Sequence, residues 1–345
     1  MVNCTFSTER TILRGENFIM MNEALWAPDA SLVIVATAPS RYWNRDGGVL
    51  ELYYTDGQKS PVWLAPFGQE MKWGPFPSKT WEPGKGGSMK AVILADVHGN
   101  SIALNKVLED VQSIGGVDEY WFLGDYAAIG HDPIGVLERI SNLSKARFIR
   151  GNVDRYICTG ELPWPQFTDV EKEPSLAPLH INIVRSFSWT AGAVGATGWL
   201  SWFQKLPSEV RLSLPDGSRV LMVHAAPGMD DGTGIDPIIS DGELFKLLKD
   251  VDVGLVLAGY THLPLDRTVG NIRLVNPGSI SNPFPPDLRA SYAVLEADEG
   301  GYELNHRPVD YDRDAVIKAV KEVNHPACEY IIRFMKGENR KNWMK

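Results

Sequence analysis

The chain has 345 residues, 44% of them hydrophobic, which is enough to bury one large core or two smaller ones. It has 34 Lys and Arg against 43 Asp and Glu, a net charge of −9, which argues against a broad surface for nucleic acid or membranes. Its three cysteines are odd in number and show no CxxC spacing, which argues against a disulfide framework or a thiolate metal site. No apolar stretch reaches the roughly 20 residues of a membrane span, and the N-terminus lacks a signal-peptide core. We therefore expect a cytoplasmic protein that binds neither a nucleic-acid duplex nor a membrane.

Residues 1–88 allow two interpretations. Residues 31–39 and 48–67 have the pattern of strands, the second as a hairpin around Asp56 and Gly57, which predicts a small β unit. Alternatively, the residues just before Met89 can be encoded by a purine-rich ribosome-binding site upstream of a start codon. Met89 would then begin the natural protein, and N-terminal sequencing would decide. In either case we expect a junction within residues 81–90.

After Met89, short β-branched runs alternate with helical stretches, which predicts an α/β fold. The runs are residues 90–95, 119–123, 146–150, 219–225 and 253–259. Residues 100–116 illustrate the helical pattern, with Ser101 as the expected cap and Gly115-Gly116 as the stop. Continuous apolar strands indicate a sheet covered on both faces, and right-handed crossovers bring the carboxyl ends of its strands to one edge, where ligands bind.

Each of these runs is followed at once by a side chain that can bind a metal ion. A single such residue would usually be a helix cap or a turn residue, but the same relation holds at five strand ends. Carboxylate, imidazole and amide groups without sulfur favour Mn, Fe, Zn or Mg over thiophilic ions. The residues are Asp96, His98, Asp125, Asn152, His224 and His262.

The blocks DVHGN, GDYAAIG, GNVD, HAAPG and GYTH, in this order, resemble the calcineurin-like metallophosphoesterase superfamily. The likeness is greatest to its small bacterial and archaeal phosphoesterases, the phosphodiesterase-like branch, and includes the later stretches RLVNPGSI and RPVDYD. The resemblance implies a β-sandwich flanked by helices over residues 89–338, followed by a basic tail at 339–345. Residues 1–88 lie outside it.

The resemblance also implies a dinuclear metal site. Asp96, His98 and His262 would hold a first ion, Asp125 would bridge, and Asn152 with His224 would hold the second. The ions would be divalent, with Mn²⁺ first and Fe, Zn, Mg or Ni as alternatives. A metal-bound hydroxide, its pKa lowered towards roughly 7, would attack the phosphorus of a small phosphoester in line. Nucleotide-derived esters are among the candidate substrates.

Tyr260 stands where family members usually have a histidine that completes the second metal's shell. A phenol has a pKa near 10 and must lose its proton before it binds, so we expect a weakened second site. Three outcomes stay open. Waters complete a partly occupied site, which we favour; the phenolate binds a ferric ion; or the site holds one metal and is slow or inactive. In the last case the chain would keep the fold as a scaffold that binds other proteins.

Four residues are the catalytic candidates: Asp125, Asn152, Asp154 and His131. Asp154 is expected to orient a ligating histidine. His131 is a candidate proton donor or phosphate contact, with a solvated loop histidine as the alternative. Val153 replaces a histidine of the GNHD branch, which removes a candidate general acid worth about 10²- to 10⁴-fold in rate.

Other conspicuous residues have simpler explanations. Arg150 fits a surface ion pair better than a phosphate contact, and His180, His306 and His325 are taken as structural or surface residues. Residues 186–207 have helical length, and their aromatic side chains form either core or a cap that selects the substrate. Residues 327–345 predict an amphipathic helix before the basic tail. The sequence is compatible with a homo-oligomer.

Overall fold

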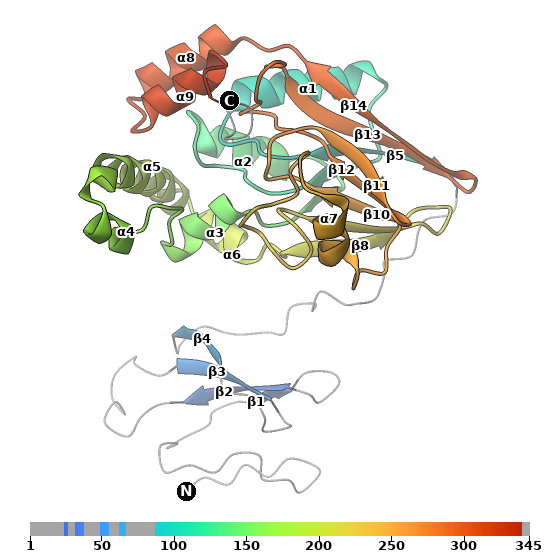
Figure 1. The fold of residues 1–345 in the computed structure, drawn as a ribbon, viewed down its shortest axis with the longest axis horizontal. Coiled ribbons are helices and arrows are strands. Elements are labelled where there is room, and N and C mark those ends of the chain that lie inside the picture. Colours follow the sequence, from blue (N-terminus) through green and yellow to red (C-terminus); the bar gives the residue numbers. More distant parts are fainter. Residues whose placement is uncertain (1–23, 27–31, 38–48, 55–61, 67–86, 340–345) are drawn as a thin grey trace, which may run out of the picture. The chain divides into compact units, whose positions relative to one another are not determined.

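The computed structural model describes residues 24–26, 32–37, 49–54, 62–66 and 87–339, and the chain divides into two compact units, Met1–Ser78 and Lys79–Lys345. The described residues of the first unit form an antiparallel sheet in the order β1-β2-β3-β4 (Figure 1). Its strands are β1 (Ala24–Trp26), β2 (Leu32–Thr37), β3 (Val49–Tyr54) and β4 (Val62–Pro66). The expected turn at Asp56 and Gly57 lies outside the described residues. Whether residues 1–88 belong to the natural protein stays a prediction.

The second unit contains two five-stranded mixed sheets (Figure 1). The first has the order β14-β13-β5-β6-β7 and comprises β5 (Met89–Leu94), β6 (Glu119–Phe122), β7 (Ala146–Phe148), β13 (Ala290–Asp298) and β14 (Gly301–Val309). The second has the order β11-β12-β10-β9-β8 and comprises β8 (Glu209–Ser213), β9 (Arg219–Val223), β10 (Leu255–Ala258), β11 (Leu265–Val269) and β12 (Ile272–Asn276). Strands β5, β6 and β7 run parallel, as do β9, β10 and β12. The predicted α/β fold with a β-sandwich is confirmed.

Strand alternation places one side of each sheet in the sandwich interior. On β5, Ala91 and Ile93 join a buried cluster with Met222 of β9 and Leu257 of β10. The intervening Val92 packs outward into a second cluster with the helices. The run at 90–95 is thus buried on both faces, which explains its continuous apolar character. The five runs divide between two sheets, whereas their pattern had predicted a single sheet.

Helices cover the outer faces of the two sheets (Figure 1). The described helices are α1 (Ser101–Ser113), α2 (Pro133–Ser141), α3 (Asn152–Thr159), α4 (Phe167–Lys172), α5 (Ala177–Ala196), α6 (Leu200–Gln204), α7 (Asp241–Leu248), α8 (Arg313–Glu322) and α9 (Cys328–Met335), with a 3-10 turn at Pro174–Leu176. Of these, α1 and α2 pack on the first sheet and α7 on the second. The cap of α1 differs from the expectation. Asn100, not Ser101, precedes the helix, and its side chain accepts a hydrogen bond from the Ala103 N–H at 3.0 Å. Asn and Ser cap helices about equally well, so the sequence could not choose between neighbours.

The aromatic stretch forms two helices, α5 and α6, because Gly198 adopts a left-handed φ of 82° between them. Trp199, Trp202 and Phe203 pack in the main core, as one of the two interpretations predicted. Trp189 differs, since its ring lies edge-on to His325, 4.7 Å between centroids, and so joins α5 to the segment before α9.

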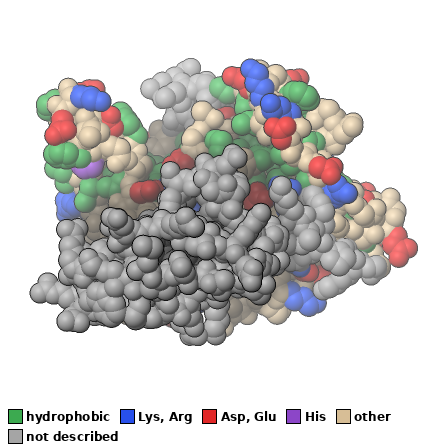
Figure 2. Space-filling view, turned by 90° about the horizontal axis from the view of Figure 1, so that it is seen from below, with side chains coloured by type: hydrophobic (Ala, Val, Ile, Leu, Met, Phe, Trp, Pro, Cys, Tyr) green, Lys and Arg blue, Asp and Glu red, His purple; other side chains and the backbone are tan. Residues whose placement is uncertain are grey.

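The α4–α5 segment exposes several large hydrophobic side chains, at the left of Figure 2. They are Trp164, Phe167, Leu179 and Ile181. The predicted C-terminal amphipathic helix is α9, which packs on α8, and residues 340–345 of the expected tail lie outside the described residues. Within the described ranges, no helix has the length and apolar character needed to cross a bilayer.

Candidate metal centre

The six candidate ligands lie together at the carboxyl ends of the parallel strands. Pairing of Leu94 with Phe122, and of Ala258 with Val223, aligns the ends of neighbouring strands within each sheet. One group of potential ligand atoms comprises Asp96, His98 and His262, and a second comprises Asp96, Asp125 and His224. Within each group these atoms lie within 4.8 Å of one another.

Asp125 and Asn152 connect the two groups. The Asp125 Oδ2 atom lies 3.8 Å from His98 Nε2 and 3.4 Å from His224 Nε2, so this carboxylate stands between the groups. Asn152 Oδ1 lies 3.0 Å from His224 Nε2. All six side chains predicted to converge are therefore neighbours, and all six residues are buried or nearly so.

The three histidines are oriented in the same way. The Nδ1 atom of His98 faces the Ala128 carbonyl, that of His224 faces the Leu123 carbonyl, and that of His262 faces the Asn282 carbonyl at 3.1 Å. Because a carbonyl can only accept, each Nδ1 carries the proton and donates it. Each Nε2 then points to the centre, where a metal ion could bind it in place of any proton, as a metal-binding imidazole requires.

A buried carboxylate oxygen at the centre is also suited to bind a metal ion. Asp96 is fully buried, its Oδ2 atom accepts the Tyr260 N–H at 3.2 Å, and its Oδ1 atom has no hydrogen-bond partner. The nearest described basic atom is His262 Nε2, 3.5 Å from Oδ1. An unpartnered buried carboxylate oxygen is costly unless a cation accompanies it, so the donor set fits divalent metal ions.

Electrostatics at the centre favour positive charge. Burial opposes protonation of His224, but Asp125 and Asp96 outweigh it and raise the pKa of this imidazole to about 10. Burial lowers the pKa of His98 below its ordinary value, although Asp125 opposes the shift. A metal ion at His224 would displace the proton that these carboxylates attract, so metal binding there should release protons.

The backbone at the centre is strained. Among the described residues, seven that are not glycine have a left-handed φ, and five of them belong to this site. The five are Asp96, His98, Asp125, Tyr260 and His262, with φ between 44° and 68°. Such conformations cost of order 1–3 kcal/mol each and persist where surrounding structure enforces them.

Two glycines let the loops approach one another. A Cβ atom on Gly124 would lie 2.6 Å from the Gly151 nitrogen and 2.8 Å from His224 Nδ1. A Cβ atom on Gly151 would overlap the Asp125 carboxylate. These positions require glycine because the loops after β6 and β7 are in direct contact.

Asp154 has a different role from the one expected. It does not orient a histidine; its carboxylate accepts the N–H groups of Asp125 and Gly151 at 2.8 Å and of Tyr126 at 3.0 Å. Burial and then Asp125 raise its pKa to about 7, although these hydrogen bonds oppose the shift. Asp154 thus fixes the backbone of two ligand loops, which a sequence alone cannot reveal.

Tyr260 lies beside the second group with its hydroxyl directed elsewhere. Its ring is edge-on to His224, 5.7 Å between centroids. The single hydroxyl proton is shared between two acceptors, the Gly232 carbonyl at 2.6 Å and, farther away, Asp231 Oδ1 at 3.2 Å. Sequence analysis did not single out Asp231, which also accepts the Tyr156 hydroxyl. Its only signal in the sequence is its place seven residues after His224.

The remaining candidates occupy the periphery of the centre. His131 is buried and belongs to neither ligand group, and its Nε2 atom lies 3.5 Å from the Ser101 hydroxyl. Val153 is buried in the main core, although its N–H donates to Asp125 Oδ1 at 3.0 Å. Arg150 makes the expected ion pair, 3.6 Å from Asp230.

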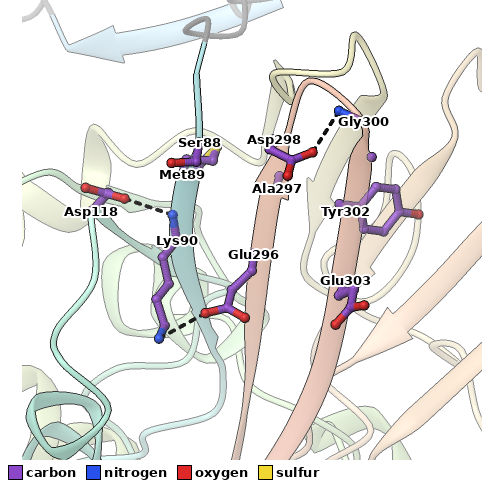
Figure 3. Close-up of a pocket in the computed structure, with 11 residues that line it drawn as sticks. Ser88, Met89, Lys90, Asp118, Glu296, Ala297, Asp298, Gly300, Tyr302 and Glu303 are labelled. Carbon is purple, nitrogen blue, oxygen red and sulfur yellow. Dashed lines mark hydrogen bonds and ion pairs between the residues drawn. The ribbon is translucent and has the colours of Figure 1, made fainter.

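An open cavity of about 710 Å³ lies at the opposite end of β5 from Asp96 (Figure 3). Its charged lining consists of Lys90, Asp118, Glu296, Asp298 and Glu303. Lys90 pairs with Glu296 at 3.0 Å, and the excess of carboxylates would repel an anionic phosphoester. The six residues of β5 separate it from the centre by roughly 20 Å, so it has no part in the site.

Comparison with known proteins identifies the family. The sequence model of the calcineurin-like phosphoesterase superfamily domain matches residues 89–300, more than half of the chain. The chain belongs to the calcineurin-like phosphoesterase superfamily. The resemblance predicted from the sequence blocks is confirmed. As a superfamily member, the chain is a metal-dependent hydrolase of phosphoesters.

Individual relatives cover most of this phosphoesterase domain. An uncharacterized protein of Methanocaldococcus jannaschii is 27% identical in an alignment 256 residues long that covers 68% of this chain and 93% of that protein. The solved structure of a hypothetical protein from Pyrococcus horikoshii has a TM-score of 0.60 at 21% identity and covers 71% of this chain and 97% of its own. That of a metallophosphoesterase from Sphaerobacter thermophilus has a TM-score of 0.55 at 24% identity and covers 73% and 99%. Both structures share the fold of this phosphoesterase.

Proposed function

We propose that residues 89–338 hydrolyse a small phosphodiester or phosphomonoester with two divalent ions, Mn²⁺ first, the second bound more weakly. The observation that carries the proposal is a pair of adjoining ligand groups, one with His98 and His262 and the other with Asp125 and His224, that share Asp96, whose Oδ1 atom has no hydrogen-bond partner. The free thiols of Cys158 and Cys328 support a reducing, cytoplasmic setting.

In this proposal each ligand has a defined task. Asp96, His98 and His262 would hold the first ion, and Asn152 with His224 would hold the second. Asp125 bridges, since its Oδ2 atom faces histidines of both groups while Oδ1 is held by the Val153 N–H. Bound divalent ions would lower the pKa of a coordinated water and offset the charge of the phosphoryl oxygens. Asp154 keeps the loops that carry Asp125 and Asn152 in place.

Of the three outcomes for the second position, the geometry disfavours the phenolate, and we propose that water takes the place of the missing histidine. The Tyr260 hydroxyl donates its proton to the Gly232 carbonyl and Asp231. Burial and then Asp231 raise its pKa well above the ordinary value. Both effects disfavour the phenolate that a ferric ion would need.

Residue 153 is a valine, which cannot protonate the leaving group. We therefore propose esters with good leaving groups, such as aryl or nucleotide-derived phosphodiesters, as the better substrates. His131 stays a candidate proton donor. If it has that role, His131→Asn should slow alkyl esters more than nitrophenyl esters.

Hydrolysis of bis-p-nitrophenyl phosphate with added Mn²⁺ tests the proposal. Asp125→Asn should reduce the rate at least about 100-fold, because even residues that only support ligands cost 10- to 100-fold. Asp118→Asn is the matched control, an exposed aspartate at the far end of the sheet. No Mn²⁺-dependent activity in the wild-type protein would favour the scaffold function instead.

A further inference from the structure

Asp231 accepts hydrogen bonds from two tyrosine hydroxyls beside the second metal position. The Tyr156 hydroxyl donates to Asp231 Oδ2, and the Tyr260 hydroxyl donates to Oδ1 at 3.2 Å. The Gly232 N–H donates to Oδ1 at 2.7 Å and so holds the carboxylate on its own loop. The three side chains come from α3, from the loop after β9 and from the loop after β10, and they meet only in the fold.

Both tyrosines lie next to ligands of the second position. Tyr156 follows Asn152 by one turn of α3, so the two side chains share a helix face. The Tyr260 ring packs edge-on against His224. A single side chain, Tyr156 or Tyr260, therefore lies between Asp231 and two of the three proposed ligands of the second ion, Asn152 and His224.

The hydrogen bond from Tyr156 to Asp231 favours one orientation of the Asn152 amide. Because the Tyr156 hydroxyl gives its proton to Asp231, its oxygen can only accept from the Asn152 side chain one turn away, which favours the NH₂ group on that side. The amide oxygen then points the other way, to His224 Nε2 at 3.0 Å, where an ion would bind. Without this constraint an asparagine amide can rotate and present its NH₂ group to the ion.

The neighbouring Asp230 binds Arg155, so Asp231 remains available to accept from the two tyrosines. Arg155 binds Asp230 through contacts of 2.9, 3.1 and 3.2 Å, and also pairs with Glu161. Its contact with Asp231 is longer, at 3.4 Å. Asp230 is thus the main partner of the arginine, while Asp231 serves the tyrosines.

We infer that Asp231 is a positioning residue for the second metal ion: it orients the Asn152 oxygen through Tyr156 and holds the Tyr260 hydroxyl out of the coordination sphere. This inference rests on the proposed dinuclear function. It assigns the specific support of the second ion to a residue outside all five sequence blocks that carry ligands.

Calorimetric titration of the metal-free full chain with Mn²⁺ tests it. Wild-type protein should bind two ions, and Asp231→Asn should weaken the second about 10- to 100-fold while the first keeps its affinity. Tyr156→Phe, which removes one hydroxyl and no charge, should weaken the second ion in the same range. Asp231→Glu should recover part of the loss, and Asp230→Asn is the matched control that should change neither affinity.

Each contrary result has a distinct meaning. An unchanged second affinity in both Asp231→Asn and Tyr156→Phe would overturn the inference and leave the proposed function standing. An equal loss at both sites would show that Asp231 only supports the fold, which also overturns it. A wild-type protein that binds fewer than two ions would overturn the dinuclear proposal itself.

Discussion

The Nε2 atoms of His98 and His262 lie 3.1 Å apart, although each ring has its Nδ1 proton committed to a backbone carbonyl. Two lone pairs therefore face each other in a buried site. Two nitrogens bound to one ion at about 2.0–2.1 Å lie roughly 2.9–3.4 Å apart at angles of about 90–109°. The separation thus suits two ligands of a single cation, which would also relieve their repulsion.

Replacement of His262 by alanine should therefore remove the first ion selectively. We expect the affinity of that site for Mn²⁺ to fall at least about 100-fold, because a ligand itself is lost and not only its support. Metal content after dialysis, measured by elemental analysis, should drop by one ion per chain. His180→Ala, a half-buried histidine on α5, is the matched control. Full metal content in His262→Ala would contradict the assignment.

Replacement of Tyr260 by histidine should strengthen the second site. An imidazole adds a neutral nitrogen ligand where the phenol offers a proton-bearing hydroxyl, so Mn²⁺ affinity and the rate at limiting metal should rise about tenfold or more. Tyr260→Phe removes the hydroxyl without adding a ligand, so it distinguishes the effect of the lost hydroxyl from that of the added imidazole. The rate of bis-p-nitrophenyl phosphate hydrolysis provides the measurement. An unchanged or lower rate for Tyr260→His at limiting Mn²⁺ would count against this account.

Much of this architecture could be predicted because its signals are local. Apolar runs followed directly by Asp, Asn or His predicted both the parallel strands and the edge at which His224 and His262 meet. The direction of the Tyr260 hydroxyl could not be predicted, because it depends on Asp231, 29 residues away in another loop. The same holds for Asp154, whose partners are backbone N–H groups that any residue could supply.

The variant Asp154→Asn tests whether Asp154 stabilises the loops that carry Asp125 and Asn152. Asparagine offers one acceptor oxygen, and its NH₂ group would face backbone N–H donors, so the free energy of unfolding should fall by about 1–3 kcal/mol. Urea unfolding in the presence of a chelator measures this without a contribution from bound ions. Asp169→Asn is the matched control, since that carboxylate accepts the Gln166 N–H on the exposed surface. Equal stability of Asp154→Asn and wild type would refute the role.

His325 should make the protein sensitive to acid. Its ring is 2% exposed, its Nδ1 atom accepts the Ala327 N–H at 3.0 Å, and burial followed by repulsion from His131 lowers its pKa from 6.5 to about 4. As the pH falls, the unfolded chain binds the proton first. The free energy of unfolding should therefore be unaffected above pH 6.5 and fall between there and about pH 4, by at most roughly 3 kcal/mol.

The variant His325→Asn isolates this contribution, because asparagine keeps an acceptor for the Ala327 N–H but does not titrate. Urea unfolding between about pH 7 and pH 4.5 should show a shallower loss of stability for His325→Asn than for wild type. His180→Asn should keep the wild-type slope. Parallel curves for His325→Asn and wild type would contradict this prediction. They would mean that protonation of His325 does not lower the free energy of unfolding, and that other groups cause the loss of stability in acid.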